Sequence, residues 1–184
     1  MITPTYPLTT PRLHLRPFTP DDLDALHAYE SRPDVARYLY WQPRDRDTTR
    51  TFLDKKITRH TIHDEGDAID LAITLRTTGE LIGNTLLIWT SKQHRQGEIG
   101  YVLHPDHHGH GYAPEAARQM LHIGFTHLHL HRITGRLDAR NKASARVLEK
   151  LGMRHEATLV DNEIVKDEWS SETIYAILEN EWTP

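Results

Sequence analysis

The stretch EIGYVLHPDHHGHGYAPEAARQML, residues 98–121, contains the strand-to-helix transition on which the fold of this chain depends. Residues 98–104 are rich in aromatic and β-branched side chains and predict a β-strand. From Tyr112 onward, small and apolar residues recur about one helical turn apart, which predicts an amphipathic helix. The eight residues between 104 and 111 include four histidines and two glycines. This loop is an anion site, a metal site or a solvated surface loop.

The two glycines favour the anion site. Gly109 and Gly111 directly precede the predicted helix, whose N-terminus exposes unpaired N–H groups and the positive end of the helix dipole. Glycine also lets a backbone approach a ligand without a Cβ in the way. A pyrophosphate bound by main-chain groups fits this pattern. The Rossmann and Walker patterns are both incomplete, because the third glycine of the first and the lysine of the second are missing.

The histidines offer the competing metal hypothesis. These residues are His104, His107, His108 and His110. They lie in a glycine-interrupted loop rather than four residues apart on one helical face, and no clear carboxylate-plus-histidine signature occurs elsewhere. Because the chain has no cysteine, thiolate ligands, disulfides and cysteine nucleophiles are excluded. We therefore expect no metal, and each histidine taken singly is typical of a solvated loop.

The remaining segments predict a single domain of the α+β or mixed α/β class. Alternating apolar residues over 67–104 indicate an antiparallel three-stranded meander. Further strands are expected over 12–18, 131–139, 153–160 and 172–180. Helices are expected over 19–30, 32–43, 46–62, 112–128 and 141–152, the last with Asn141 as N-cap and Gly152 at its end.

Bulk composition narrows the function classes. The 184-residue chain has a net charge of −4 and a pI of about 6.4, which argues against broad binding to nucleic acid or to an anionic membrane. No apolar run has the length of a signal peptide or of a membrane span. We therefore expect a cytoplasmic protein.

Four blocks of the chain resemble the Gcn-related N-acetyltransferase (GNAT) superfamily. They are LTTPRLHLRPFTPDDLDAL (8–26), the stretch 98–121, LDARNKASARVLEKLGM (137–153) and WSSETIYAILENEW (169–182). They look most like the Rim-type ribosomal-protein N-terminal acetyltransferases. The resemblance implies one N-acetyltransferase domain over residues 8–182. It also implies a mixed, mainly antiparallel sheet with a splayed strand pair and helices on both faces.

The resemblance implies acetyl-CoA as the acyl donor. In the family, the glycine loop binds the CoA pyrophosphate through backbone N–H groups, and the matching residues here are His108, Gly109, His110, Gly111, Tyr112 and Ala113. His108 replaces the usual arginine or glutamine. Asn141 matches an asparagine that family members place against the cofactor, although an N-cap role alone would explain it equally well.

The splayed strand pair is where the family holds pantetheine. The matching exposed edge is formed by Tyr101, Val102 and Leu103, which are also ordinary core-strand residues. A backbone N–H of Val102 or Leu103 would polarise the thioester carbonyl, as in an oxyanion hole.

Two residues are candidates for proton transfer. Glu98 lies on the glycine-loop strand, where some relatives carry a catalytic glutamate, and it is the expected base, acting directly or through water. Ser144 matches a serine that the Rim-like branch places near the CoA sulfur, where it would protonate the leaving thiolate. Many relatives use a tyrosine one turn later, and that position is Leu148 here.

The acceptor is expected to be an amine of unspecified kind. A protein N-terminal α-amine, a polyamine or amino acid, and an amine-bearing antibiotic all fit, with Tyr38 and Trp41 expected to contact it. The branch often forms dimers, and the C-terminal strand edge offers a surface for one. Two alternatives stay open, namely a module that binds acyl-CoA without turnover and a histidine-loop metal protein.

Overall fold

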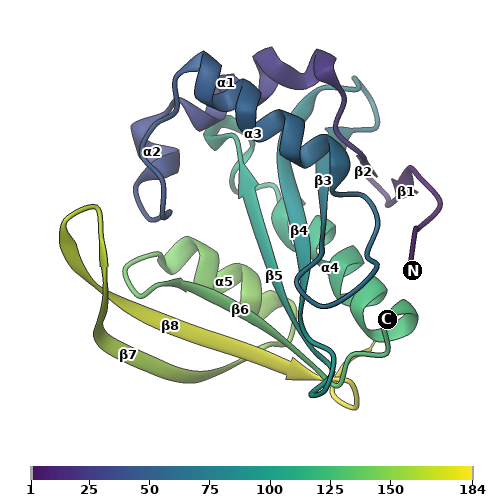
Figure 1. The fold of residues 1–184 in the computed structure, drawn as a ribbon, viewed down its shortest axis with the longest axis vertical. Helices are drawn as coiled ribbons and strands as arrows, with labels where there is room; N and C mark the ends of the chain where they lie inside the picture. Colours follow the sequence, from purple (N-terminus) through teal and green to yellow (C-terminus); the bar gives the residue numbers. More distant parts are fainter. Residues whose placement is uncertain (1, 184) are drawn as a thin grey trace.

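The structure is a computed structural model, and it describes residues 2–183. One sheet runs through the molecule (Figure 1), with its strands in the order β1-β2-β3-β4-β5-β6-β8-β7. The strands are β1 (Leu8–Thr9), β2 (Leu13–Arg16), β3 (Ala68–Leu75), β4 (Leu81–Ser91), β5 (Gln96–Leu103), β6 (Arg132–Asp138), β7 (Arg154–Val165) and β8 (Glu168–Leu178). The helices are α1 (Leu23–Glu30), α2 (Pro33–Ala36), α3 (Arg46–Thr58), α4 (Tyr112–His122) and α5 (Lys142–Lys150).

Strands β3, β4 and β5 form the antiparallel meander that the sequence predicts. Ile69 of β3 lies opposite Leu87 of β4, and Leu87 lies opposite Ile99 of β5. The polar positions of β3 are buried along with the apolar ones, including Asp70 and Thr74. Helices therefore cover both faces of this part of the sheet.

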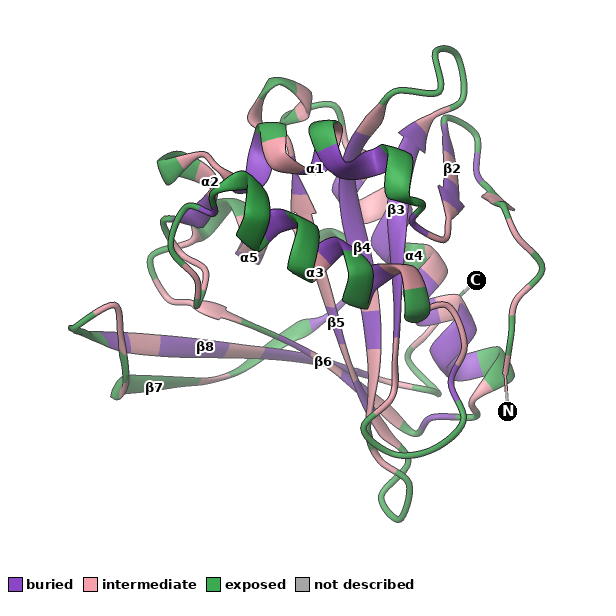
Figure 2. Ribbon diagram, turned by 45° about the horizontal axis from the view of Figure 1, so that its top comes forward, coloured by how far each residue is buried: buried purple, intermediate pink, exposed green. Residues whose placement is uncertain are grey.

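The helices divide into two layers, one on each face of the sheet. Helices α4 and α5 pack on one face over the larger apolar core. Helices α1 and α3 pack on the other face over a smaller cluster formed by Phe18, Leu23, Leu26, Tyr29, Leu53 and Ala72. Figure 2 shows β3 and much of β4 as buried and β7 as largely exposed. The mixed α/β class with helices on both faces is confirmed.

Strands β5 and β6 are the parallel pair of the sheet, and they diverge along their length. Their pairing covers Gln96–Arg132, Gly97–Ile133 and Glu98–Thr134 and then stops. Beyond that point β5 stays paired with β4 as far as Leu103, while β6 pairs with β8. Over residues 99–103 the β6 side of β5 has no paired strand among residues 2–183, and Figure 1 shows the two strands diverging there. We call this divergence of the two backbones the gap. The splayed pair expected from the resemblance is present.

Several predicted elements differ in extent. The helix expected over 32–43 is shorter and ends at Ala36, as α2. The Ala36 carbonyl does not continue the helical hydrogen-bond pattern, because it accepts from Leu39 N–H and from the distant Lys166 ammonium. The helix expected over 112–128 continues beyond α4 as a π-helix, Ile123–His127. The two closing strands are longer than expected, since their hairpin extends well beyond the core. Within residues 2–183, no helix combines the length and apolarity that crossing a membrane requires.

The third helix buries a different face from the one expected. The sequence suggests an apolar stripe of Phe52, Ile57 and Ile62, but α3 buries Thr49, Leu53 and Lys56. Ile62 lies beyond the helix in a bridge with Ile2. Lys56 is buried because a carboxylate of β3 neutralises it, which hydrophobic periodicity cannot reveal.

Candidate functional site

The glycine loop leads directly into α4. Gly109 and Gly111 have φ values of 82° and 79°, a left-handed conformation that favours glycine. Gly111 is the N-cap of α4 and has no side chain to cap the first turn. A Cβ at Gly109 would meet nothing within 4 Å, so the loop surface is open there. The first-turn N–H groups of α4 are therefore free to bind an anion such as a pyrophosphate.

Arg12 clamps this loop from the N-terminal segment. Its Nη1 donates to the His110 carbonyl at 2.7 Å, and its Nε donates to Oε2 of Glu115 at 2.7 Å. The guanidinium also lies over the Tyr112 ring, 4.8 Å from the centroid. Burial would raise the pKa of Glu115, but the hydrogen bonds from Thr10 and Arg12 outweigh it and lower that pKa. Sequence reasoning missed this clamp because the partners lie about 100 residues apart.

The loop histidines take separate partners. His108 Nε2 lies 3.1 Å from the Leu103 carbonyl, and His107 Nε2 lies 3.2 Å from Oε1 of Glu80. His110 stacks near Tyr112, with 5.6 Å between ring centroids. Among residues 2–183, no group of three or more histidine, aspartate or glutamate side chains is placed to hold a metal ion. Because the histidines have separate partners, the groups that the loop offers to a ligand are mainly its backbone N–H groups.

The side chain of Tyr101, on β5, contacts Ser144, on α5. The Tyr101 hydroxyl lies 2.9 Å from the Ser144 carbonyl and 2.9 Å from Ser144 Oγ. Burial raises the pKa of Tyr101 far above its usual range, so its hydroxyl stays protonated and donates. Asn141 is the N-cap of α5, as predicted, with its Oδ1 accepting from Ser144 N–H at 3.1 Å. A contact of Asn141 with a cofactor stays a prediction.

Glu98 stands at the last paired position of β5, where the gap begins. It shares a strand face with Gly100 and Val102, and Val102 packs on the α1 side of the sheet. Burial raises the pKa of Glu98; the positive charge of Arg136 opposes this and the negative charge of Glu172 adds to it. A carboxylate with a raised pKa can accept a proton from an ammonium ion more readily than an exposed one.

A second charged pair lies beside Glu98 and was not predicted. Arg136 of β6 donates two hydrogen bonds to Glu172 of β8, at 2.7 and 2.6 Å. Glu172 is only 1% exposed. The Tyr40 hydroxyl donates to Glu163 Oε1 at 2.7 Å. Burial and then this hydrogen bond raise the pKa of Tyr40, and the charge of Glu172 adds to the shift. Local sequence patterns carried no signal for this pair, because Arg136 and Glu172 lie on different strands.

The two predicted acceptor contacts occupy different surroundings. Tyr38 lines a cavity of about 500 Å³ between α2 and the β7–β8 hairpin. Trp41 instead packs against Arg44, whose guanidinium lies 4.4 Å from the Trp41 ring centroid. Arg44 is itself buried and paired with Glu30 at 2.7 Å. The structure brings Tyr38, and not Trp41, to that cavity.

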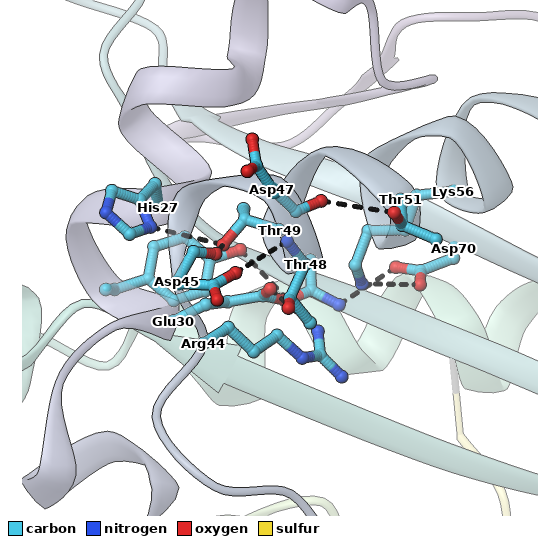
Figure 3. Close-up of polar contacts among 12 residues, drawn as sticks. His27, Glu30, Arg44, Asp45, Asp47, Thr48, Thr49, Thr51, Lys56 and Asp70 are labelled. Carbon is cyan, nitrogen blue, oxygen red and sulfur yellow. Dashed lines mark hydrogen bonds and ion pairs between the residues drawn. The ribbon is translucent and has the colours of Figure 1, made fainter.

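A cluster of buried charges lies under α3. Lys56 Nζ is 2.7 Å from Asp70 Oδ2, and Asn84 donates to the other oxygen of Asp70 at 2.9 Å. Figure 3 shows this pair beside the Glu30–Arg44 pair. All of these side chains have partners, so we assign the cluster a structural role.

Comparison with known proteins agrees with the geometry. The model of the acetyltransferase (GNAT) domain matches residues 12–154. The chain is 34% identical to the uncharacterized N-acetyltransferase YnaD of Bacillus subtilis, over 95% of this chain and 98% of the relative. It is 25% identical to the spermidine N(1)-acetyltransferase of Escherichia coli, over 91% and 87% of the two chains. A GNAT-family acetyltransferase structure from Bacillus anthracis superimposes with a TM-score of 0.84 and 32% identity, over 94% and 98% of the chains.

Proposed function

This chain belongs to the GNAT family of acetyltransferases, and from that premise we propose that it transfers the acetyl group of acetyl-CoA directly to a primary amine. The observation that carries the proposal is the gap between β5 and β6, which begins at Glu98 and ends near the glycine loop. A gap that exposes a strand edge suits an extended pantetheine chain. Residues 8–182 would act together as one catalytic domain.

The glycine loop is the proposed pyrophosphate site. Backbone N–H groups of the segment from His108 to Ala113 would bind the phosphates at the start of α4. The free edge formed by Tyr101, Val102 and Leu103 would hold pantetheine. An N–H of Val102 or Leu103 would stabilise the oxyanion.

The two residues assigned to proton transfer lie on opposite faces of the sheet. Glu98 lies on the α1 side and would accept, directly or through a water, the proton that the attacking ammonium must lose. Ser144 lies on the α5 side and would donate a proton to the leaving thiolate. The Tyr101 hydroxyl, 2.9 Å from Ser144 Oγ, is placed to hold that serine in position. The N–C bond thus forms on one face while the C–S bond breaks toward the other.

The test is acetyl-CoA-dependent release of CoA thiol with a panel of amines, with the product identified by mass. The panel includes peptides with free N-termini, suggested by the Rim-type resemblance, and spermidine, suggested by the relative from Escherichia coli. We expect thiol release that depends on an added amine, with a mass gain of one acetyl group. CoA binding without amine-dependent release would instead favour a module that binds acyl-CoA without turnover.

A further inference from the structure

The cavity between α2 and the β7–β8 hairpin carries an excess of positive charge. Its charged lining residues are Arg37, Arg140, Lys166 and Glu168. Three cations face one carboxylate, so the lining has a net charge of +2 at neutral pH. The whole chain has a net charge of −4. A local excess of the opposite sign marks this cavity as a place for an anion.

Two of the three cations have no carboxylate within ion-pair distance in the part of the chain that the structure describes. Within residues 2–183, no carboxylate lies within 4.0 Å of the Arg37 guanidinium or the Lys166 ammonium. Lys166 donates to the Ala36 carbonyl. Burial, then repulsion from Arg140, lowers the pKa of Lys166, and the more distant charge of Asp138 only partly opposes this shift. Arg140 differs, because Asp138 holds it at 2.7 Å. A bound anion would restore the charge balance that Arg37 and Lys166 lack.

A chain of side-chain contacts links the cavity to the proposed reaction centre. Tyr38 lines the cavity, and Arg140 lies 5.9 Å from the Tyr38 ring centroid. Arg140 directly precedes Asn141, the N-cap of the helix that carries Ser144.

Asp138, which holds Arg140, lies opposite Glu172 in the β6–β8 pair. Glu172 in turn binds Arg136, the cation whose charge acts on Glu98. Near the expected amine the carboxyl groups of Glu98 and Glu172 outnumber the Arg136 guanidinium, whereas cations are in excess in the cavity.

We propose that the acetyl acceptor is a small amine that also carries an anionic group, a carboxylate or a phosphonate or phosphate, several bonds from its nitrogen. The ammonium end would approach Glu98, and Arg37 and Lys166 would bind the anionic end. A polyamine would place a second ammonium among these cations, where like charges repel. This inference rests on the proposed acetyl transfer and specifies its substrate class.

The test compares three five-carbon amines that differ only at the far end: ω-aminovalerate, pentylamine and cadaverine. Each is titrated calorimetrically into protein saturated with CoA, so that no turnover is needed. We expect ω-aminovalerate to bind about tenfold more tightly than cadaverine, with pentylamine between them, since a charge-assisted hydrogen bond contributes about this much. An aminoalkylphosphonate of similar length distinguishes a phosphate-type group from a carboxylate.

Two charge reversals complete the design. Arg37 is exposed and makes no ion pair with a carboxylate of the described residues, so the Arg37→Glu variant should fold. It should reverse the order in which the three amines bind. Arg50→Glu makes the same charge change on the exposed surface of α3 and should leave the order unchanged. Lys166→Met should weaken ω-aminovalerate and leave pentylamine unaffected.

The outcomes separate the two claims. Cadaverine binding as tightly as ω-aminovalerate, an order that Arg37→Glu does not change, or no binding of any amine would overturn the anionic-acceptor inference. Those results would leave the proposed acetyl transfer intact, provided that CoA itself binds when it is titrated into the protein before the amines. Absence of CoA binding would instead overturn the proposed function.

Discussion

Glu98 is held where its charged form is disfavoured. Burial raises its pKa, with Arg136 opposing and Glu172 reinforcing that shift. We expect Glu98→Gln to lower kcat/KM by about 100-fold or more, as removal of a general base does. The acid limb of the pH–rate profile, where Glu98 becomes protonated and inactive, should disappear in Glu98→Gln and persist in Glu98→Asp. An unchanged profile in Glu98→Gln would assign the base to another group.

The same pKa shift has a consequence for stability. Because the folded state raises the pKa of Glu98, it binds that proton more tightly than the unfolded chain does. The contribution of this tighter proton binding to the free energy of unfolding is therefore present at low pH. It is lost as the pH rises through the pKa that Glu98 has in the folded state. The Gln variant should be more stable than the parent at neutral pH, on the order of 0.5 kcal/mol.

Arg12 acts on the glycine loop without belonging to it. Its bonds to the His110 carbonyl and to Glu115 fix the loop against the N-terminal segment. We expect Arg12→Gln to weaken acetyl-CoA binding about tenfold, the effect of losing a charge-assisted bond. S-acetylpantetheine has no pyrophosphate, so it should bind the variant as it binds the parent, and Arg12→Lys should recover part of the loss. Equal weakening of both donors would show that Arg12 supports the fold in general.

At the scale of elements, the contact between Tyr101 and Ser144 ties β5 to α5 across the open part of the gap. We expect Tyr101→Phe to lower the free energy of unfolding by about 1 kcal/mol, the usual effect of one lost hydrogen bond. It should also lower kcat more than it raises KM for acetyl-CoA. If Tyr101 acts through Ser144, the double variant with Ser144→Ala should be no slower than Ser144→Ala alone. Additive losses in kcat would separate the two residues.

The elements were predictable to different degrees. The meander, the glycine loop and helices α4 and α5 follow from local patterns of spacing and capping, and they form nearly where expected. The length of the β7–β8 hairpin and the early end of α2 depend on contacts such as Lys166 with Ala36, which join distant segments. The charged partners of the site, Arg136 and Glu172, lie on different strands, so their pairing follows from sheet order, which local patterns do not specify.

At the scale of the molecule, the sheet is held from both faces, and the α1–α3 face contains buried charge. Lys56 neutralises Asp70 beneath α3 (Figure 3). We expect Lys56→Met to destabilise the fold by about 3–5 kcal/mol, because it leaves Asp70 buried without a countercharge. The unfolding temperature should fall by about 10 °C in a chain of this size. Lys55→Met removes the same charge from an exposed site one residue earlier and should shift it little. Similar shifts in both variants would argue against a structural role for the buried pair.

The central claim for the whole molecule is that the glycine loop and the β5–β6 gap form one binding site for acetyl-CoA. The most direct measurement is the dissociation constant of CoA, and of pantetheine, for the parent protein and for Gly111→Val. The control is Gly66→Val, because Gly66 also has a positive φ but lies outside the loop, with nothing within 4 Å of an added Cβ. We expect Gly111→Val to weaken CoA by about 100-fold, since it distorts the start of α4, and to leave pantetheine unchanged. Equal CoA affinity in the parent and in a folded Gly111→Val protein would contradict the claim.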